Sequence, residues 1–182
     1  MSSIKKIAIT GPESTGKSWL ANRLASHFGT AYVPEYAREY IDKLSGNYNR
    51  QDLYQIAREQ LEREEQAASQ AKRLLFCDTE LLVIKIWSLH AFGECHPWIL
   101  SQLEQNTYDL FLLCDIDLPW EPDPQREHPH LRKYFFDWYK RELDGYGFPY
   151  RVISGVGENR IELAVDRVNE FFIDQADGTF CD

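Results

Sequence analysis

The sequence predicts a doubly wound α/β fold, in which helices cover both faces of a five-stranded parallel sheet. Short apolar runs alternate along the chain with longer segments whose apolar residues recur at helical spacing. Two of the runs, at residues 74–77 and 110–114, are continuous, as is typical of parallel strands that are covered on both faces. A glycine-rich loop joins the first run to the first helical segment. Together these features predict repeated strand–helix units in one sheet.

Five apolar runs are expected to form the strands, and both the third and the fourth run lead into acidic residues. Asp78 ends the third, and Asp115-Ile116-Asp117 follows the fourth. The runs cover residues 4–10, 30–33, 74–77, 110–114 and 150–153.

Capping residues mark the expected helices. The first helix follows the glycine-rich loop and should end at Gly29. A short helix is expected from Tyr36, and Asn49 is expected to cap a long third helix. A further helix should run from Leu131 to Gly145, and the last helix should follow a second asparagine cap, at position 159.

Composition and charge indicate one compact domain of 182 residues, with 43% hydrophobic and 27% charged residues. We expect a single domain over residues 1–182, with its core at about 4–172 and a short tail at 173–182. The net charge of −9 argues against a nucleic-acid partner, because such binding relies on lysine and arginine. The N-terminus is neither a signal peptide nor a membrane span, which predicts a cytoplasmic protein. Oligomeric state stays open, and the cysteines are expected to be free thiols: Cys77, Cys95, Cys114 and Cys181.

The strongest chemical signal is GPESTGKS at residues 11–18, a full match to GxxxxGK[ST] between a strand and a helix. Its glycines let backbone N–H groups converge on phosphate oxygens, and the helix start adds its positive dipole end. Lys17 should reach the outer phosphates and Ser18 should ligate magnesium, so the cofactors expected are ATP and Mg²⁺. The expected ATP contacts are Gly11, Glu13, Ser14, Thr15, Gly16, Lys17 and Ser18.

Asp78 is the candidate for the second magnesium ligand, because folds of this type keep such a carboxylate at a strand end. An ordinary turn aspartate is the alternative. Asp115 and Asp117 compete for the same role.

The segment between residues 118 and 130 contains four prolines, which predicts a loop. Positive charge gathers in and after it, so that a closing loop could bring Arg126 or Arg132 to the transferred phosphate. A solvated basic loop is the alternative. The loop at residues 154–159 is a second candidate: it either holds the adenine of ATP, with Asn159 in contact, or forms a plain glycine turn with a helix cap.

Several segments resemble the ribosylnicotinamide kinase domain of the NadR-like family, from about residue 4 to residue 172. The resemblance implies a P-loop kinase fold with a LID loop, and transfer of the ATP γ-phosphate to the 5′-hydroxyl of nicotinamide riboside. It also implies ATP at residues 11–18, magnesium at Asp78, and Arg126 and Arg132 in the closing loop. Adenylyl transfer and DNA-binding repression are not expected, because no HxGH pattern is present. The segments are GPESTGKS, VPEYAREY, CDTELLVIKIW, LLCDIDLPWEPDPQREHP and VISGVGENR.

Glu35 is expected to be the general base, since it follows the second strand, across the cleft from the phosphate loop. At the start of a helix it should be ionised. Asp78 is the rival base, and Glu35 could instead cap the helix or pair with Arg38. A positively charged acceptor would suit Glu35, Tyr36, Tyr40 and Trp87, with burial of the aromatic rings in the core as the alternative. Arg38 is also expected to bind the substrate.

Three functions remain open at this level. The first is a ribosylnicotinamide kinase, an ATP:ribosylnicotinamide 5′-phosphotransferase. The second is a P-loop kinase of another nucleoside or small alcohol. The third is a non-catalytic ATP-binding regulatory module. The first two share every ATP-binding residue, and only the acceptor pocket separates them.

Overall fold

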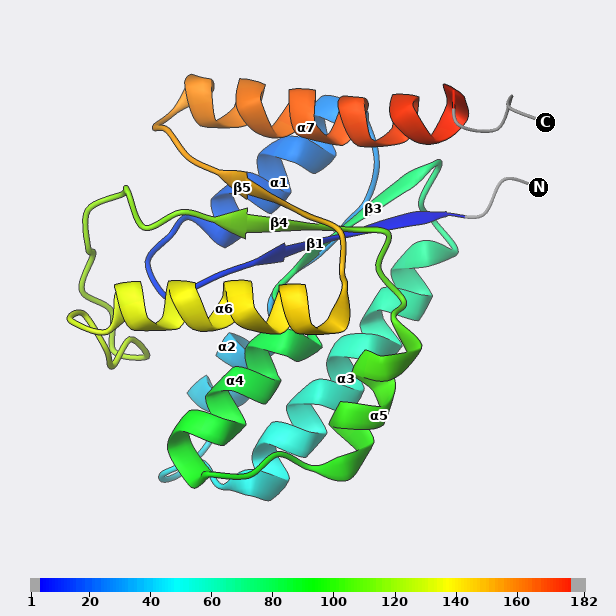
Figure 1. Cartoon of the computed structure of the whole chain (residues 1–182). Coiled ribbons are helices and arrows are strands. Elements are labelled where there is room, and N and C mark those ends of the chain that lie inside the picture. The colour runs from blue at the N-terminus through cyan, green and yellow to red at the C-terminus, as the bar shows by residue number, and fades with distance from the viewer. Residues whose placement is uncertain (1–3, 178–182) are drawn as a thin grey trace.

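The computed structural model describes residues 4–177 and contains five strands and seven helices in that range (Figure 1). The elements are β1 Lys5–Thr10, α1 Lys17–Phe28, β2 Tyr32–Val33, α2 Tyr36–Asp42, α3 Arg50–Ala68, β3 Leu74–Asp78, α4 Leu81–Phe92, α5 Pro97–Gln105, β4 Leu110–Cys114, α6 Arg132–Tyr146, β5 Tyr150–Ile153 and α7 Glu158–Asp177. All five predicted strands are confirmed, although β2 is only two residues long.

The strands form one parallel sheet in the order β2-β3-β1-β4-β5. Helices α1 and α7 cover one face of the sheet, and α2 to α6 lie on the other (Figure 1). The two faces bury separate apolar clusters, in which successive strand residues point to opposite sides: Ile7 and Ile9 lie under α1, and Ala8 faces the other helices. Covering both faces explains why residues 74–77 of β3 and 110–114 of β4 are continuously apolar.

The predicted caps are partly confirmed. Gly29 ends α1 in the left-handed conformation, and Asn49 caps α3 through hydrogen bonds to the backbone N–H groups of Gln51 and Asp52. Gly145 was wrongly placed as a helix end, because α6 continues to Tyr146 and Gly147 takes the left-handed turn, with φ of 67°.

The last helix also differs from expectation. It begins at Glu158, so Asn159 lies inside the helix and is not its cap. It continues to Asp177, past residue 173 where a tail was expected. The rest of that tail, with Cys181, lies outside the described residues; Cys77, Cys95 and Cys114 are free thiols, as predicted.

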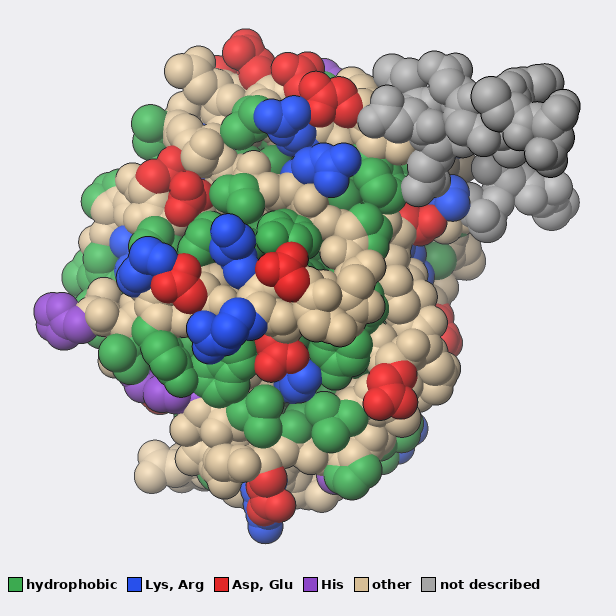
Figure 2. Space-filling model, in the orientation of Figure 1, with side chains coloured by type: hydrophobic (Ala, Val, Ile, Leu, Met, Phe, Trp, Pro, Cys, Tyr) green, Lys and Arg blue, Asp and Glu red, His purple; other side chains and the backbone are tan. Residues whose placement is uncertain are grey.

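Helices α4 and α5 were not predicted. The residues of α4 are apolar on nearly all sides of the helix, so its sequence shows no one-sided pattern of apolar residues. Within residues 4–177, no helix is long and apolar enough to cross a membrane. On the face seen in Figure 2, acidic and basic side chains lie interspersed over α6. One ion pair within this helix joins Lys133 to Asp137.

Two fully buried glutamates lie between the sheet and the helices that pack on it. Glu80 caps α4 by accepting the Leu82 N–H, and it accepts the hydroxyl of Thr10 at 2.8 Å. Glu64 of α3 accepts the hydroxyl of Tyr108 at 2.8 Å. Burial raises the pKa of each glutamate from 4.5 to about 7.

The change Glu80→Gln should make stability less dependent on pH. Because the folded-state pKa is raised, the Glu80 contribution to stability is complete below about pH 4.5 and is lost as pH rises through about 7. An amide has no charge to bury, and it can still accept the Leu82 N–H. Thermal unfolding at about pH 5 and about pH 8 should show a smaller drop in Tm for the variant, with Glu64 leaving some slope. Equal drops in both proteins would contradict this account.

Candidate active site

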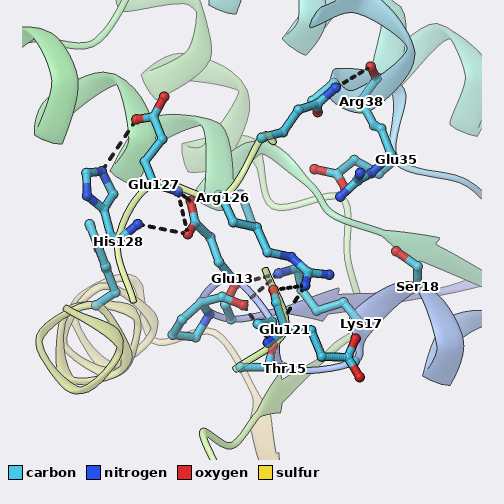
Figure 3. A pocket seen from close by; sticks show the side chains of 18 of the residues that line it. Glu13, Thr15, Lys17, Ser18, Glu35, Arg38, Glu121, Arg126, Glu127 and His128 are labelled. Carbon is cyan, nitrogen blue, oxygen red and sulfur yellow. Dashed lines mark hydrogen bonds and ion pairs between the residues drawn. The ribbon is translucent and has the colours of Figure 1, made fainter. Parts of the chain in front are cut away.

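A cavity of about 850 Å³ opens at the carboxyl ends of the strands. This is the edge where open α/β sheets bind ligands. Its walls come from residues 11–18, helices α2, α4 and α6, the 118–130 loop and the β5–α7 connection. Figure 3 shows that Lys17, Ser18, Glu35 and Arg126 lie on the walls of this same cavity.

The phosphate loop is held in a shape that only glycine permits at one position. Gly11 has φ of 130°, and a Cβ there would lie 3.0 Å from the carbonyl oxygen of Cys114. The helix α1 begins at Lys17, so its first N–H groups face the cavity. Lys17 Nζ donates to the carbonyls of Gly11 and Pro12, at 3.0 and 2.8 Å. The loop is thus arranged to receive an anion.

Two phosphate-loop side chains contact the 118–130 loop. The Glu13 carboxylate accepts the backbone N–H groups of Glu127 and His128, at 3.2 and 3.3 Å (Figure 3). The Ser14 hydroxyl accepts the N–H of Glu121 at 2.9 Å. Both were expected as ATP contacts. In this structure their side chains join the phosphate loop to the proline-rich loop.

The two candidate arginines have different positions. Arg126 lines the cavity and donates to the carbonyl of Glu121 and, at 3.5 Å, to the Ser14 hydroxyl. Arg132 begins α6 and donates to the carbonyls of Leu118 and Ser14, at 2.9 and 3.1 Å. Arg132 does not line the cavity. Of the two, only Arg126 faces the space where a phosphate would lie.

Glu35 and the end of β3 are brought together by the register of two neighbouring strands, in which Val33 lies opposite Cys77. Glu35 lines the cavity and makes no side-chain cap to α2 within the described residues. Arg38 pairs with Asp123 at 2.9 Å, so the expected alternatives of a cap or a Glu35–Arg38 bridge are not seen.

The surroundings of Glu35 shift the pKa of its carboxyl group. Burial raises this pKa, and the charge of Asp78 adds to the rise. Lys17, Arg38 and Arg126 act in the opposite direction. The pKa therefore lies above the ordinary glutamate value, and the ionised state of Glu35 in the reaction stays a prediction.

Asp78 has the features of a magnesium ligand. It is 1% exposed, and its Oδ1 has no hydrogen-bond partner in the described part of the chain. Burial raises its pKa, against the effects of the Ser18 hydroxyl and Lys17. A buried carboxylate oxygen without a donor, beside a hydroxyl, fits Mg²⁺, which prefers oxygen ligands. The competing aspartates are engaged elsewhere: Asp115 accepts the Ile116 N–H, and Asp117 pairs with Arg160.

Arg160 was not singled out from the sequence, yet it joins three segments beneath the cavity. Its side chain is fully buried and pairs with Asp117 at 2.8 Å. The guanidinium also donates to the carbonyls of Thr15, Asp115 and Gly155. These lie in the phosphate loop, after β4 and after β5. Its neighbour Asn159, an expected ATP contact, is exposed in the first turn of α7 and does not line the cavity.

Aromatic rings line the far end of the cavity. Trp87 of α4 lies there as predicted, with Tyr48 edge-on to it at 4.8 Å between ring centroids. No motif in the sequence marked Tyr48. The expected contact Tyr36 lies outside the cavity, because its ring packs under Arg63 at 4.1 Å.

The fold and the cavity together define the class of this protein, which has a P-loop fold of the kinase type. The solved structure of NadR with NAD and AMP-PNP has a TM-score of 0.76 at 21% identity, covering 93% of this chain and 49% of that one. The solved structure of NadR with NR has a TM-score of 0.77 at 20% identity, and the match covers 93% of this chain and 51% of that one. The structure of deoxyadenosine kinase from M. mycoides has a TM-score of 0.62 at 17% identity, and the match covers 91% of this chain and 99% of that one.

The chain belongs to the AAA domain family, whose model matches residues 6–160. It is also 30% identical, over 129 residues, to the trifunctional NAD biosynthesis/regulator proteins NadR of Escherichia coli and Salmonella typhimurium. That match covers 68% of this chain and 31% of each relative, so the chain spans about a third of their length. The resemblance to the NadR-like family is therefore confirmed.

Replacing Arg160 with methionine should lower the free energy of unfolding by about 3 kcal/mol, because each buried carbonyl left without a donor costs about 1–3 kcal/mol. The change removes the donor of three backbone carbonyls and the ion pair to Asp117, which is 32% exposed and keeps the Gly155 N–H. Urea unfolding measures the loss. The control Arg23→Met removes an exposed ion pair to Glu158 at the start of α7 and should cost less than about 1 kcal/mol. Similar losses in both variants would contradict a structural role for the buried Arg160 side chain.

Proposed function

We propose that this chain is a ribosylnicotinamide kinase, which transfers the γ-phosphate of ATP to the 5′-hydroxyl of nicotinamide riboside. One observation carries the proposal: the phosphate-loop residues Lys17 and Ser18 share a single cavity with the carboxylate of Glu35. A phosphate donor and a hydroxyl acceptor could therefore meet between them. The similarity to NadR, one of whose structures contains NR, supports this choice of acceptor.

On the donor side, the backbone N–H groups at residues 11–18 would hold the ATP phosphates. Lys17 would leave its loop carbonyls for the outer phosphate oxygens. Arg126 would approach from the proline-rich loop and offset the charge that develops on transfer. Ser18 and Asp78 would hold magnesium, whose positive charge would neutralise phosphate oxygens.

On the acceptor side, Glu35 would accept the proton of the 5′-hydroxyl as its oxygen attacks the γ-phosphorus and ADP departs. Arg38 is already paired with Asp123, which favours an acceptor bearing a hydroxyl over one bearing a phosphate. Trp87 and Tyr48 would pack against the nicotinamide ring of the acceptor. This ring is a positively charged pyridinium, which aromatic faces attract. The single-domain organisation and the cytoplasmic location stay predictions.

The acceptor assignment is tested by competition between nucleosides. Nicotinamide riboside should have a kcat/KM at least about tenfold above those of uridine and cytidine, since each 1.4 kcal/mol of cation–π and charge attraction gives a factor of ten. The measurement is ADP formation at limiting concentrations of each nucleoside. Deoxyadenosine and thymidylate belong in the same panel, because structural neighbours include a deoxyadenosine kinase and a thymidylate kinase. A preference for any of these other acceptors would contradict the proposal.

The variant Glu35→Gln should lower kcat by about 10²- to 10⁴-fold, the usual loss on removing a general base. ATP binding, measured by calorimetry, should change little, because Glu35 lies on the acceptor side of the cavity. Since burial raises the pKa of Glu35, the acidic limb of the wild-type rate profile should lie above the ordinary glutamate value and disappear in the variant. If the variant kept more than about a tenth of the rate, the base would instead be Asp78.

A further inference from the structure

The strand that precedes Glu35 is too short to fix the position of this residue. β2 has two residues and lies at the edge of the sheet, where among the described strands it pairs with β3. The ladder ends at Val33 opposite Cys77, before the chain reaches Glu35. A reacting carboxylate must be held within a fraction of an ångström, so another group has to fix this segment.

The side chain of Gln60 makes such a contact, in addition to the hydrogen bond from the Glu35 backbone N–H to the Asp78 carboxylate. It projects from α3 and is 1% exposed. Its Oε1 accepts the N–H of Tyr36 at 3.0 Å, and its Nε2 donates to the carbonyl of Thr79 at 3.4 Å. Tyr36 directly follows Glu35, and Thr79 directly follows Asp78. One amide group therefore connects the residue that follows Glu35 with the residue that follows Asp78.

The turn after β3 also needs a stabilising contact, because its backbone is strained at Thr79. Thr79 has φ of 66°, which is rare for a residue branched at Cβ. It is 2% exposed, and its Oγ1 has no hydrogen-bond partner within residues 4–177. Its N–H donates to the carbonyl of Ile9 at 3.1 Å, and its carbonyl accepts from Gln60. The turn after Asp78 is thus held from β1 on one side and from α3 on the other.

We propose that Gln60 is a positioning residue that sets Glu35 relative to Asp78. The proposal rests on the proposed kinase function. Both halves of the amide are needed, since one accepts a hydrogen bond and the other donates one. No methionine or leucine could do either. Loss of the link would let the β2 end move without altering the phosphate loop, whose hydrogen bonds involve other segments.

The test is a double-mutant cycle with Glu35. Gln60→Met, which keeps the side-chain length, should lower kcat by about 10- to 100-fold, as expected for a displacement of about 1 Å. The KM for ATP should stay within about twofold. In the Glu35→Gln background, the same change should lower kcat less than about twofold, because Gln60 acts through Glu35. The control Leu53→Ala, a fully buried change on the same helix, should lower Tm and leave kcat per folded molecule unchanged.

An equal loss in both backgrounds, or no loss in either, would overturn the proposal. If Gln60→Met does not fold, Gln60→Glu is compared in the wild-type and Glu35→Gln backgrounds instead. The glutamate keeps an acceptor for the Tyr36 N–H but, when ionised, has no donor for the Thr79 carbonyl. If Glu35→Gln alone leaves kcat unchanged, both this proposal and the assigned base are wrong. If Glu35→Gln is slow and both Gln60 variants are normal, only the role of Gln60 is wrong.

Discussion

The candidate site depends on one constraint, the parallel pairing of β1 with both β3 and β4. Parallel strands end at the same edge of a sheet, so residues distant in sequence come together there. The phosphate loop follows β1, Asp78 ends β3, and the loop bearing Arg126 follows β4. Phosphoryl transfer needs positive charge around the phosphate and a carboxylate beside the acceptor. A rigid sheet edge can hold these opposite charges apart until substrates come between them.

Most of the fold could be predicted from the sequence. The apolar run at 110–114 became a strand with the same bounds, because a parallel strand covered on both faces is apolar throughout. The run at 150–153 also kept its bounds. The phosphate loop was predicted because its motif specifies a backbone shape that glycine alone permits. Helix α4 was missed because it is apolar on nearly all sides, and Gly145 was misplaced because Gly147 competes for the same turn.

The site could be predicted only where a residue acts close to its own motif. Glu13 is part of the phosphate loop, yet its partners are backbone groups more than a hundred positions away, at Glu127 and His128. Arg160 joins three separate connections in the same way, and Gln60 joins two strand ends. Such links depend on packing between distant segments, which spacing along the chain does not encode. The raised pKa of Glu35 likewise follows from burial, which only the folded chain defines.

The central claim is that ATP and a nucleoside react with each other in this cavity. The most direct measurement is ³¹P NMR of the protein incubated with ATP, magnesium and nicotinamide riboside. The account predicts a phosphomonoester signal that grows in equal amount with ADP, and very little ADP when the nucleoside is left out. Release of inorganic phosphate with ADP at the same rate with or without nucleoside would contradict it. That result would make the chain an ATPase module, whatever its similarity to NadR.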